Sequence, residues 1–312
     1  MAFRWSERQH SRVLRRRRAA SVRELSEQSP PPARFCALGA VWSSSPAASP
    51  HVDAAPLSRQ RLWRCLLLLT CVLWASPAFA TRVVSLNLCT DQLLVLLAPE
   101  KIAALSPLAR DPTLSFVASR AASLPVVRPS AEAVLRLHPD LILAGPFGAQ
   151  ATVALLKSEG LAVHRISLPQ TFPAIRAQTR RVALLLGVPE RGAALVSTMD
   201  ATLAAVHPLP RPRTAIAWEP RGFTEGPDSL MGAILRAAGL TNLSDGNHLG
   251  LEALMRLAPD LVVVPEAPHF PSLATDLLQS PALSSIPRRS LPPALTLCAG
   301  PFTAQAVSML AR

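Results

Sequence analysis

The sequence predicts an α/β protein of two similar lobes with parallel-sheet cores joined by a long interdomain helix. A repeated segment, the alternation of strands with helices, and one long helical stretch between the halves support this prediction. Residues Glu132 to Leu143 read EAVLRLHPDLIL, and residues Glu252 to Val263 read EALMRLAPDLVV, at a constant offset of 120 residues. That offset is too long for a solenoid repeat and is about the size of one small domain.

Each copy of the repeat reads as a short amphipathic helix, a Pro-Asp turn and a buried strand of branched apolar residues. The match in residue type and spacing argues against chance recurrence of a common local motif. In the first half, further strands are predicted over 82–88, 101–106 and 161–168, and Asp91 is the expected N-cap of a helix over 92–97. Strands that alternate with helices favour a parallel sheet with helices on its faces.

Residues 172–206 show helical periodicity without a strand signal, interrupted at Gly187–Pro189. The second piece, 190–206, would be about 25 Å long at 1.5 Å per residue, and we interpret it as a strut between the lobes. The alternative is an extra packing helix on one lobe. Strand and helix alternate again from residue 214, and a terminal helix is predicted over 303–311.

The predicted organisation has five segments. They are an untranslated or disordered extension (1–58), a signal peptide (59–80), an N-terminal α/β lobe (81–170), an interlobe helix (171–208) and a C-terminal α/β lobe (209–312). In the predicted signal peptide, three arginines precede a short apolar run and a small-x-small ending at Ala80, which is typical of secretory signals. The run is shorter than the ~20 residues that a membrane span needs. We therefore expect export to the periplasm, with cleavage near Ala80.

The net charge of +12 at first suggests a nucleic-acid partner. Residues 1–80, however, hold 12 arginines against four acidic residues, which accounts for most of that charge. The basic character therefore lies outside the predicted lobes, and no nucleic-acid partner is expected. After Ala80 only Cys89 and Cys298 remain. An oxidising compartment would allow them to pair, but they fall in different predicted lobes, so we expect two buried thiols.

These features together resemble the helical-backbone periplasmic solute-binding proteins, the ABC-importer components that carry ferric siderophores, haem or cobalamin. The resemblance covers most of residues 81–312 and rests on VVSLN (83–87), both repeat units, and GFTEGPDSL (222–230). It implies a monomer that captures a ferric siderophore-type iron chelate and delivers it to an ABC permease dimer in the inner membrane. Cobalamin or haem is the alternative ligand.

The resemblance also implies that one glutamate on each lobe docks onto arginines of the permease, which places these residues at Glu132 and Glu252. A carboxylate in the first helical turn is exposed and free to meet a basic partner. The alternative is that each glutamate only complements the N-terminus of its own helix.

The ligand is expected between the lobes, against loops at the C-terminal ends of the strands. The loop residues predicted to contact it are Arg110, Arg128, Phe147, Glu219, Arg221, Phe223, His248 and Phe302. Arginines would suit an anionic chelate, and phenylalanines would cover a flat or apolar ligand face. The alternative for each is ordinary: a solvated arginine, or a phenylalanine that pins its loop to the core. Trp218 is expected at a strand end that faces the ligand.

The chain contains no tyrosine, which excludes a Tyr-ligated haem and weakens an aromatic-rich cobalamin cage. The histidines after residue 80 lack metal-ligand spacing, so no bound metal and no cofactor is predicted. An exported α/β enzyme is the alternative from another class. The sequence lacks a nucleophile elbow, a phosphate-binding loop and a zinc-binding HExxH helix, so no catalytic residues are assigned.

Overall fold

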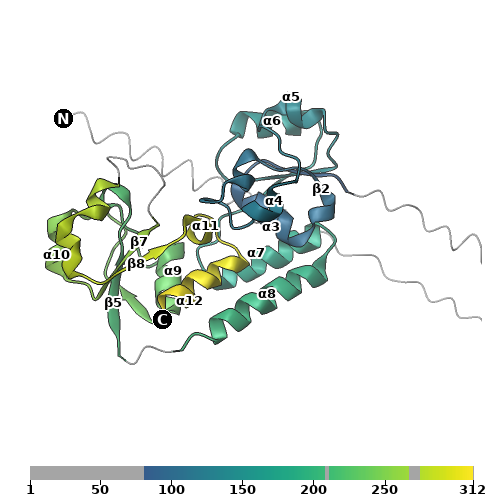
Figure 1. The fold of residues 1–312 in the computed structure, drawn as a ribbon. Helices are drawn as coiled ribbons and strands as arrows, with labels where there is room; N and C mark the ends of the chain where they lie inside the picture. Colours follow the sequence, from purple (N-terminus) through teal and green to yellow (C-terminus); the bar gives the residue numbers. More distant parts are fainter. Residues whose placement is uncertain (1–80, 208–210, 267–274, 312) are drawn as a thin grey trace, which may run out of the picture. The chain divides into compact units, whose positions relative to one another are not determined.

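The structure is a computed structural model that describes residues 81–207, 211–266 and 275–311. The described residues form two four-stranded sheets in which all neighbouring strands are parallel, each flanked by helices (Figure 1). This arrangement confirms the predicted α/β class with two similar lobes. The predicted extension and signal peptide lie outside the described residues.

The N-terminal sheet has the strand order β2-β1-β3-β4. Its strands are β1 (Val83–Ser85), β2 (Ile102–Ala104), β3 (Leu141–Ala144) and β4 (Val163–Arg165). Its helices are α3 (Leu88–Leu97), η1 (Pro99–Lys101), η2 (Pro107–Arg110), α4 (Ala118–Ala121), α5 (Ala131–Leu135) and α6 (Gln150–Ser158). Consecutive strand residues enter different cores: Val83 packs with α3 and α7, whereas Val84 packs with α5 and α6. Both faces of the sheet are therefore covered.

The C-terminal sheet has the equivalent order, β6-β5-β7-β8. Its strands are β5 (Arg213–Ala217), β6 (Leu240–Asn242), β7 (Leu261–Pro265) and β8 (Arg288–Leu291). Its helices are η3 (Pro220–Gly222), α9 (Leu230–Ala237), α10 (Leu251–Leu257), η4 (Asp276–Gln279), η5 (Pro281–Ser285), α11 (Pro293–Thr296), η6 (Pro301–Thr303) and α12 (Ala304–Leu310). Alternate residues of β5 again enter two clusters, Ala215 and Ala217 in one and Ile216 in the other.

Two helices, not one, connect the lobes. Helices α7 (Phe172–Leu185) and α8 (Pro189–Ala204) pack along one another (Figure 1). Val182 of α7 belongs to a core of the N-terminal lobe, whereas Met199 of α8 packs in the core of the C-terminal lobe. The predicted strut therefore corresponds to α8, one of two paired helices that together contribute apolar side chains to the cores of both lobes.

The repeat has the same structure in both lobes. His138 and Ala258, which occupy matching positions, both adopt left-handed backbone conformations with φ of 45° and 44°. The aspartate two residues later binds the first strand of its own lobe: Asp140 accepts a hydrogen bond from Arg82 N, and Asp260 accepts one from Thr214 N, both at 2.7 Å. The Pro-Asp turn therefore has a structural role, since it ties the repeated unit to its sheet.

Cys89 and Cys298 form a disulfide, so the expectation of two buried thiols is wrong. The two residues are 209 apart in sequence, but α3 reaches the C-terminal lobe. Leu88 belongs to the hydrophobic cluster of that lobe, and Cys89 packs against it. Assignment of the two cysteines to different lobes therefore did not separate them in space, because the lobes touch at the start of α3.

Asp91 is a buried residue inside α3 and not an N-cap. The cap is Asn87, whose Oδ1 accepts hydrogen bonds from Cys89 N and Thr90 N. Asp91 instead accepts a hydrogen bond from Ser106 N at 3.0 Å and is also hydrogen-bonded to the Ser106 hydroxyl. Burial of this carboxyl raises its pKa from 3.8 to about 7, although the hydrogen bonds from Ser106 oppose the shift.

This pKa shift predicts a pH-dependent stability. Between about pH 4 and pH 7 the folded protein holds a proton on Asp91 that the unfolded chain releases, so stability falls as the pH rises through this range. We expect the free energy of unfolding to drop by on the order of 2 kcal/mol between pH 5 and pH 8 because of this group. The Asp91→Asn variant, which mimics the protonated carboxyl, should lose that part of the drop. Urea unfolding of both proteins at the two pH values measures it, and parallel pH curves would contradict the prediction.

Candidate functional site

In both parallel sheets, the loops that follow the carboxyl ends of the strands carry most of the predicted ligand contacts. In the N-terminal lobe Arg110 follows β2 and Phe147 follows β3. Arg128 reaches the same edge because Leu105 and Val126 form a parallel bridge that extends β2. These three residues therefore lie along one edge of the sheet, where open α/β sheets bind their ligands.

The side chains at this edge are accessible. Arg110 and Arg128 are exposed, and 74% of the Phe147 side chain is open to solvent. Arg110 donates a hydrogen bond from Nη2 to the carbonyl of Leu124 at 2.6 Å, which fastens the segment that leads to Arg128. Phe147 does not pin its loop to the core. Its exposure is unusual for a phenylalanine and fits a contact surface.

The strand order places the switch point of the N-terminal sheet between β1 and β3, and Asn87 lies there. The side chain of Asn87 passes so close to Gly145 that a Cβ on this glycine would lie 2.9 Å from Asn87 Cγ. A larger residue at position 145 would therefore require the Asn87 side chain to shift. Asn87 belongs to the VVSLN motif. Interpretation of this motif as a strand followed by a helix cap would have identified Asn87 as the N-cap of α3.

The C-terminal lobe brings four predicted residues together: Glu219, Arg221, Phe223 and His248. The first three follow β5, and His248 follows β6. Glu219 N donates to Phe223 O at 2.7 Å, which closes a tight loop. Gly222 has φ of +80°, and a Cβ there would lie 2.6 Å from the carbonyl of Leu249 and 3.2 Å from His248 Nε2. The loop after β5 can therefore pack against the His248 segment only with glycine at this position.

This cluster offers charge, an aromatic face and backbone strain. Arg221 adopts a left-handed conformation with φ of 63°, and such strain is concentrated at functional sites. Phe223 is 57% exposed, and its ring meets the His248 ring edge-on at 5.9 Å between centroids. Burial of the Glu219 carboxyl raises its pKa, and the neighbouring Glu225 adds to this effect.

Two aromatic residues lie in the interior. Trp218 is 0% exposed and its Nε1 donates to the carbonyl of Leu249 at 2.9 Å, so the expectation that it faces the ligand is wrong. Phe302 is 5% exposed and stacks on Phe116 of the N-terminal lobe at 4.7 Å between centroids. The sequence alone did not reveal this pairing of rings from opposite lobes.

Three contacts join the carboxyl edges of the two sheets along a seam between the lobes. They are the Cys89–Cys298 disulfide, the stacked rings of Phe116 and Phe302, and a hydrogen bond of 2.7 Å from Leu230 N to Gln170 Oε1. Gln170 belongs to the segment between β4 and α7, and Leu230 begins α9. The predicted contacts of each lobe lie in other loops at these carboxyl edges.

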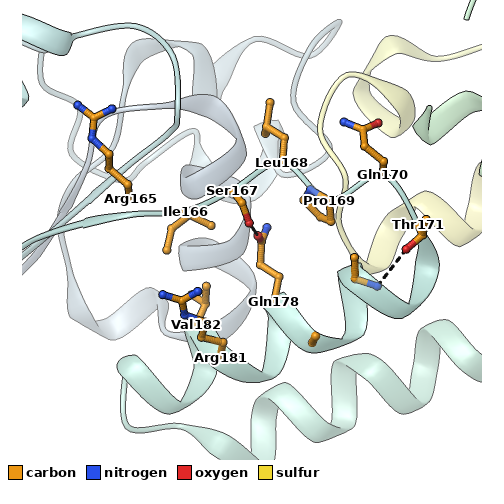
Figure 2. A pocket seen from close by; sticks show the side chains of 12 residues that line it. Arg165, Ile166, Ser167, Leu168, Pro169, Gln170, Thr171, Gln178, Arg181 and Val182 are labelled. Carbon is orange, nitrogen blue, oxygen red and sulfur yellow. Dashed lines mark hydrogen bonds between the residues drawn. The ribbon is translucent and has the colours of Figure 1, made fainter. Parts of the chain in front are cut away.

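A hollow of about 530 Å³ lies between α7 and the segment that links it to β4 (Figure 2). Ile166, Leu168 and Val182 contribute apolar lining, and polar groups come from Arg165, Ser167, Gln170, Thr171, Gln178 and Arg181. Figure 2 shows the hydrogen bond of 2.9 Å from Ser167 Oγ to Gln178 Oε1 across this region. The sequence prediction missed Arg165 because it extended this strand to residue 168, whereas β4 ends at Arg165.

Glu132 and Glu252, the predicted docking residues, are exposed on α5 and α10. Figure 1 shows each of these helices on the flank of its own lobe, away from α7 and α8. Among the described residues there is no group of three or more His, Cys, Asp or Glu residues that could hold a metal ion. No helix in this part of the chain is long and apolar enough to cross a membrane.

Two parallel-sheet lobes, with exposed polar and aromatic loops at the carboxyl ends of their strands, are typical of two-lobed α/β solute-binding proteins. The model of the family described as periplasmic binding protein matches residues 83–287. The chain therefore belongs to this family, as the sequence motifs predicted. Its members are solute-binding proteins of the ABC-importer type and not enzymes, which confirms the prediction that the chain is not an enzyme.

Known proteins agree with this assignment. A cobalamin-binding protein of Halobacterium salinarum is 32% identical over 146 residues, which cover 42% of this chain and 39% of that protein. The chain thus matches about two fifths of the length of this curated relative.

Solved structures share the fold. The periplasmic haem-binding protein RhuT from Roseiflexus has a TM-score of 0.60 at 24% identity, covering 74% of this chain and 97% of its own. The haem-binding protein HutB of Vibrio cholerae has a TM-score of 0.63 at 17% identity, covering 74% and 98%. A ferric hydroxamate transport protein from Saccharomonospora viridis has a TM-score of 0.56 at 19% identity, covering 74% and 92%. Likeness at these identities establishes the fold alone.

Proposed function

We propose that the protein captures an anionic ferric chelate of the siderophore type between its lobes and delivers it to an ABC permease dimer in the inner membrane. The main support is three exposed arginines in loops at the carboxyl edges of the two sheets. Arg110 and Arg128 contribute from one lobe, and Arg221 contributes from the other. Guanidinium groups bind carboxylate and catecholate oxygens through paired, charge-assisted hydrogen bonds.

The exposed aromatic rings supply the second part of the proposed site. Phe147 and Phe223 stand in the loops after β3 and β5, and each leaves more than half of its side chain open to solvent. Such rings can cover an apolar ligand face while the arginines hold its charge. The proposed contacts are Arg110, Arg128, Phe147, Glu219, Arg221, Phe223 and His248, with Arg165 added from the structure. Phe302, which is buried against Phe116, is proposed instead to support the seam.

The protein is proposed to act as a monomer, because one chain supplies both edges of the site. Its mechanism is capture without chemistry: the lobes hold the ligand, and the exposed Glu132 and Glu252 meet basic side chains of the permease. Cobalamin is a second candidate ligand because the curated relative is a cobalamin-binding protein. A haem bound through a tyrosine is excluded, since the chain has no tyrosine.

Calorimetric titration of the purified protein with ferric catecholate, ferric hydroxamate, ferric citrate, haem and cobalamin tests the proposed ligand class. We expect saturable binding of one ferric chelate. The Arg221→Ala and Phe223→Ala variants should each weaken that binding about tenfold or more, since each removes a contact of about 1.4 kcal/mol or more. Lys157→Ala, at the far end of α6, serves as the matched control. Tight binding of cobalamin alone would favour the second candidate, and no binding across the panel would contradict both.

A further inference from the structure

The two copies of the repeat share seven identical positions among 12, and the fold explains only some of them. Pro139 and Pro259 are buried, Leu141 and Leu261 are strand residues in the core, and the aspartates between them bind the first strands. Ala133 and Ala253 are half-buried. These identities follow from packing and hydrogen bonding within each lobe.

Two of the remaining identities are charged side chains that have no packing role within the lobes. Glu132 and Arg136 are exposed in the first lobe, as Glu252 and Arg256 are in the second. Within the described residues, the side chains of Glu132, Glu252 and Arg136 make no hydrogen bond or ion pair. Arg256 makes only a long hydrogen bond of 3.4 Å, from Nε to the carbonyl of Glu252 in its own helix. Packing within the lobes therefore does not account for either charge.

The four-residue spacing between glutamate and arginine gives each repeat unit two opposite charges in a fixed order along the helix. The arginine follows the glutamate by four residues, so the two side chains lie about one helical turn apart on the same face of the helix, roughly 5–6 Å between Cβ atoms. A partner that meets both groups must present a basic and an acidic side chain in the matching order. Such a pattern selects one docking orientation, since a reversed partner would place like charges together.

We propose that Arg136 and Arg256 are docking residues that contact acidic side chains of the permease beside the basic groups that meet Glu132 and Glu252. This proposal rests on the proposed function. The partner it requires is a protein with two similar patches, one for each lobe, and each patch carries both charges. A symmetric permease dimer satisfies that requirement, because its two halves offer the same patch twice.

The test measures binding of the full chain to membrane vesicles from its own cells, with vesicles made from the extracted lipids of the same membrane as a control. We expect the double variant Arg136→Glu with Arg256→Glu to bind at least tenfold more weakly than the wild type. The double variant Arg136→Lys with Arg256→Lys should retain most of the binding. The matched control is Lys157→Glu with Arg180→Glu, which changes the net charge equally on exposed positions of α6 and α7 and should bind normally.

Each outcome has a defined meaning. Normal binding of the Arg136→Glu and Arg256→Glu variant, together with lost binding of Glu132→Ala and Glu252→Ala, would overturn this inference and leave the proposed docking function intact. An equal loss of vesicle binding in the charge-matched control would show that the effect comes from net charge alone and would overturn the inference. Equal binding to the lipid-only vesicles would show that the partner is a lipid surface, which would also overturn the inference. If both glutamates and both arginines can be replaced without effect, the proposed docking function fails together with the inference.

Discussion

Replacement of Glu132 and Glu252 together by alanine is expected to abolish ligand uptake by cells while ligand affinity in solution stays unchanged. Both carboxylates are exposed and lie on helices that flank their lobes. Loss of a charge-assisted contact costs roughly 1.5–3 kcal/mol, so the loss of two should weaken docking by a factor of about 100 or more. Uptake by cells and calorimetry on the purified variant measure the two quantities separately.

The control for this prediction is the double variant Glu159→Ala with Glu190→Ala. These glutamates are also exposed, and their side chains make no hydrogen bond or ion pair to other residues in the described part of the chain. The control should transport normally. A collapse of ligand affinity in the Glu132→Ala and Glu252→Ala variant would place these residues in the ligand site and contradict the docking role.

Removal of the Cys89–Cys298 disulfide should produce the largest change in stability. The bond closes a loop in which the two residues are 209 apart in sequence. The chain-entropy model gives about 5 kcal/mol for a loop longer than 100 residues, and removal of native disulfides costs about 2–5 kcal/mol. We therefore expect Cys89→Ser with Cys298→Ser to lower the free energy of unfolding by roughly 3–5 kcal/mol. Urea unfolding under oxidising conditions measures the difference.

Reduction provides an independent check on the same bond. A reducing agent should destabilise the wild-type protein by a similar amount and leave the Cys89→Ser and Cys298→Ser variant unaffected. Equal stability of the wild type with and without reductant would show that the cysteines are unpaired. The pairing also bears on the proposed site, because the bond joins the two lobes between which we propose that the ligand binds. We expect the reduced protein to lose ligand affinity as the relative position of the lobes becomes less restricted.

The repeat and the resemblance motifs predicted the class and the duplication, and the strand-end rule selected the edge of each sheet where we propose the site. Periodicity is a local property, so the strong apolar strands β3 and β7 were recognisable from their sequences. Strand β8 reads Arg-Arg-Ser-Leu and lies at the edge of its sheet, and it was missed because its side chains are largely exposed. Backbone pairing with β7, which makes β8 a strand, leaves no apolar pattern in the sequence.

The candidate site shows the same division. The rule that ligands lie beyond the carboxyl ends of parallel strands selected Arg110, Phe147, Arg221 and Phe223, and the structure leaves all four exposed at those ends. The same rule gave no means of knowing which aromatic rings would point inward. Trp218 donates a hydrogen bond to the carbonyl of Leu249, and the ring of Phe302 stacks on the ring of Phe116 across the seam.

The amino-acid sequence by itself determined the two-lobed α/β architecture, because each lobe is built from short-range patterns of apolar and turn residues that recur 120 positions apart. Tertiary structure alone decided how the lobes meet. The Cys89–Cys298 bond and the Phe116–Phe302 stack join residues distant in sequence that become neighbours only when complete lobes pack together, whereas the Asp91 carboxyl is buried beside Ser106 within the folded N-terminal lobe. Contacts of that kind have no local signal, since their energy comes from surfaces that exist only after each lobe has folded.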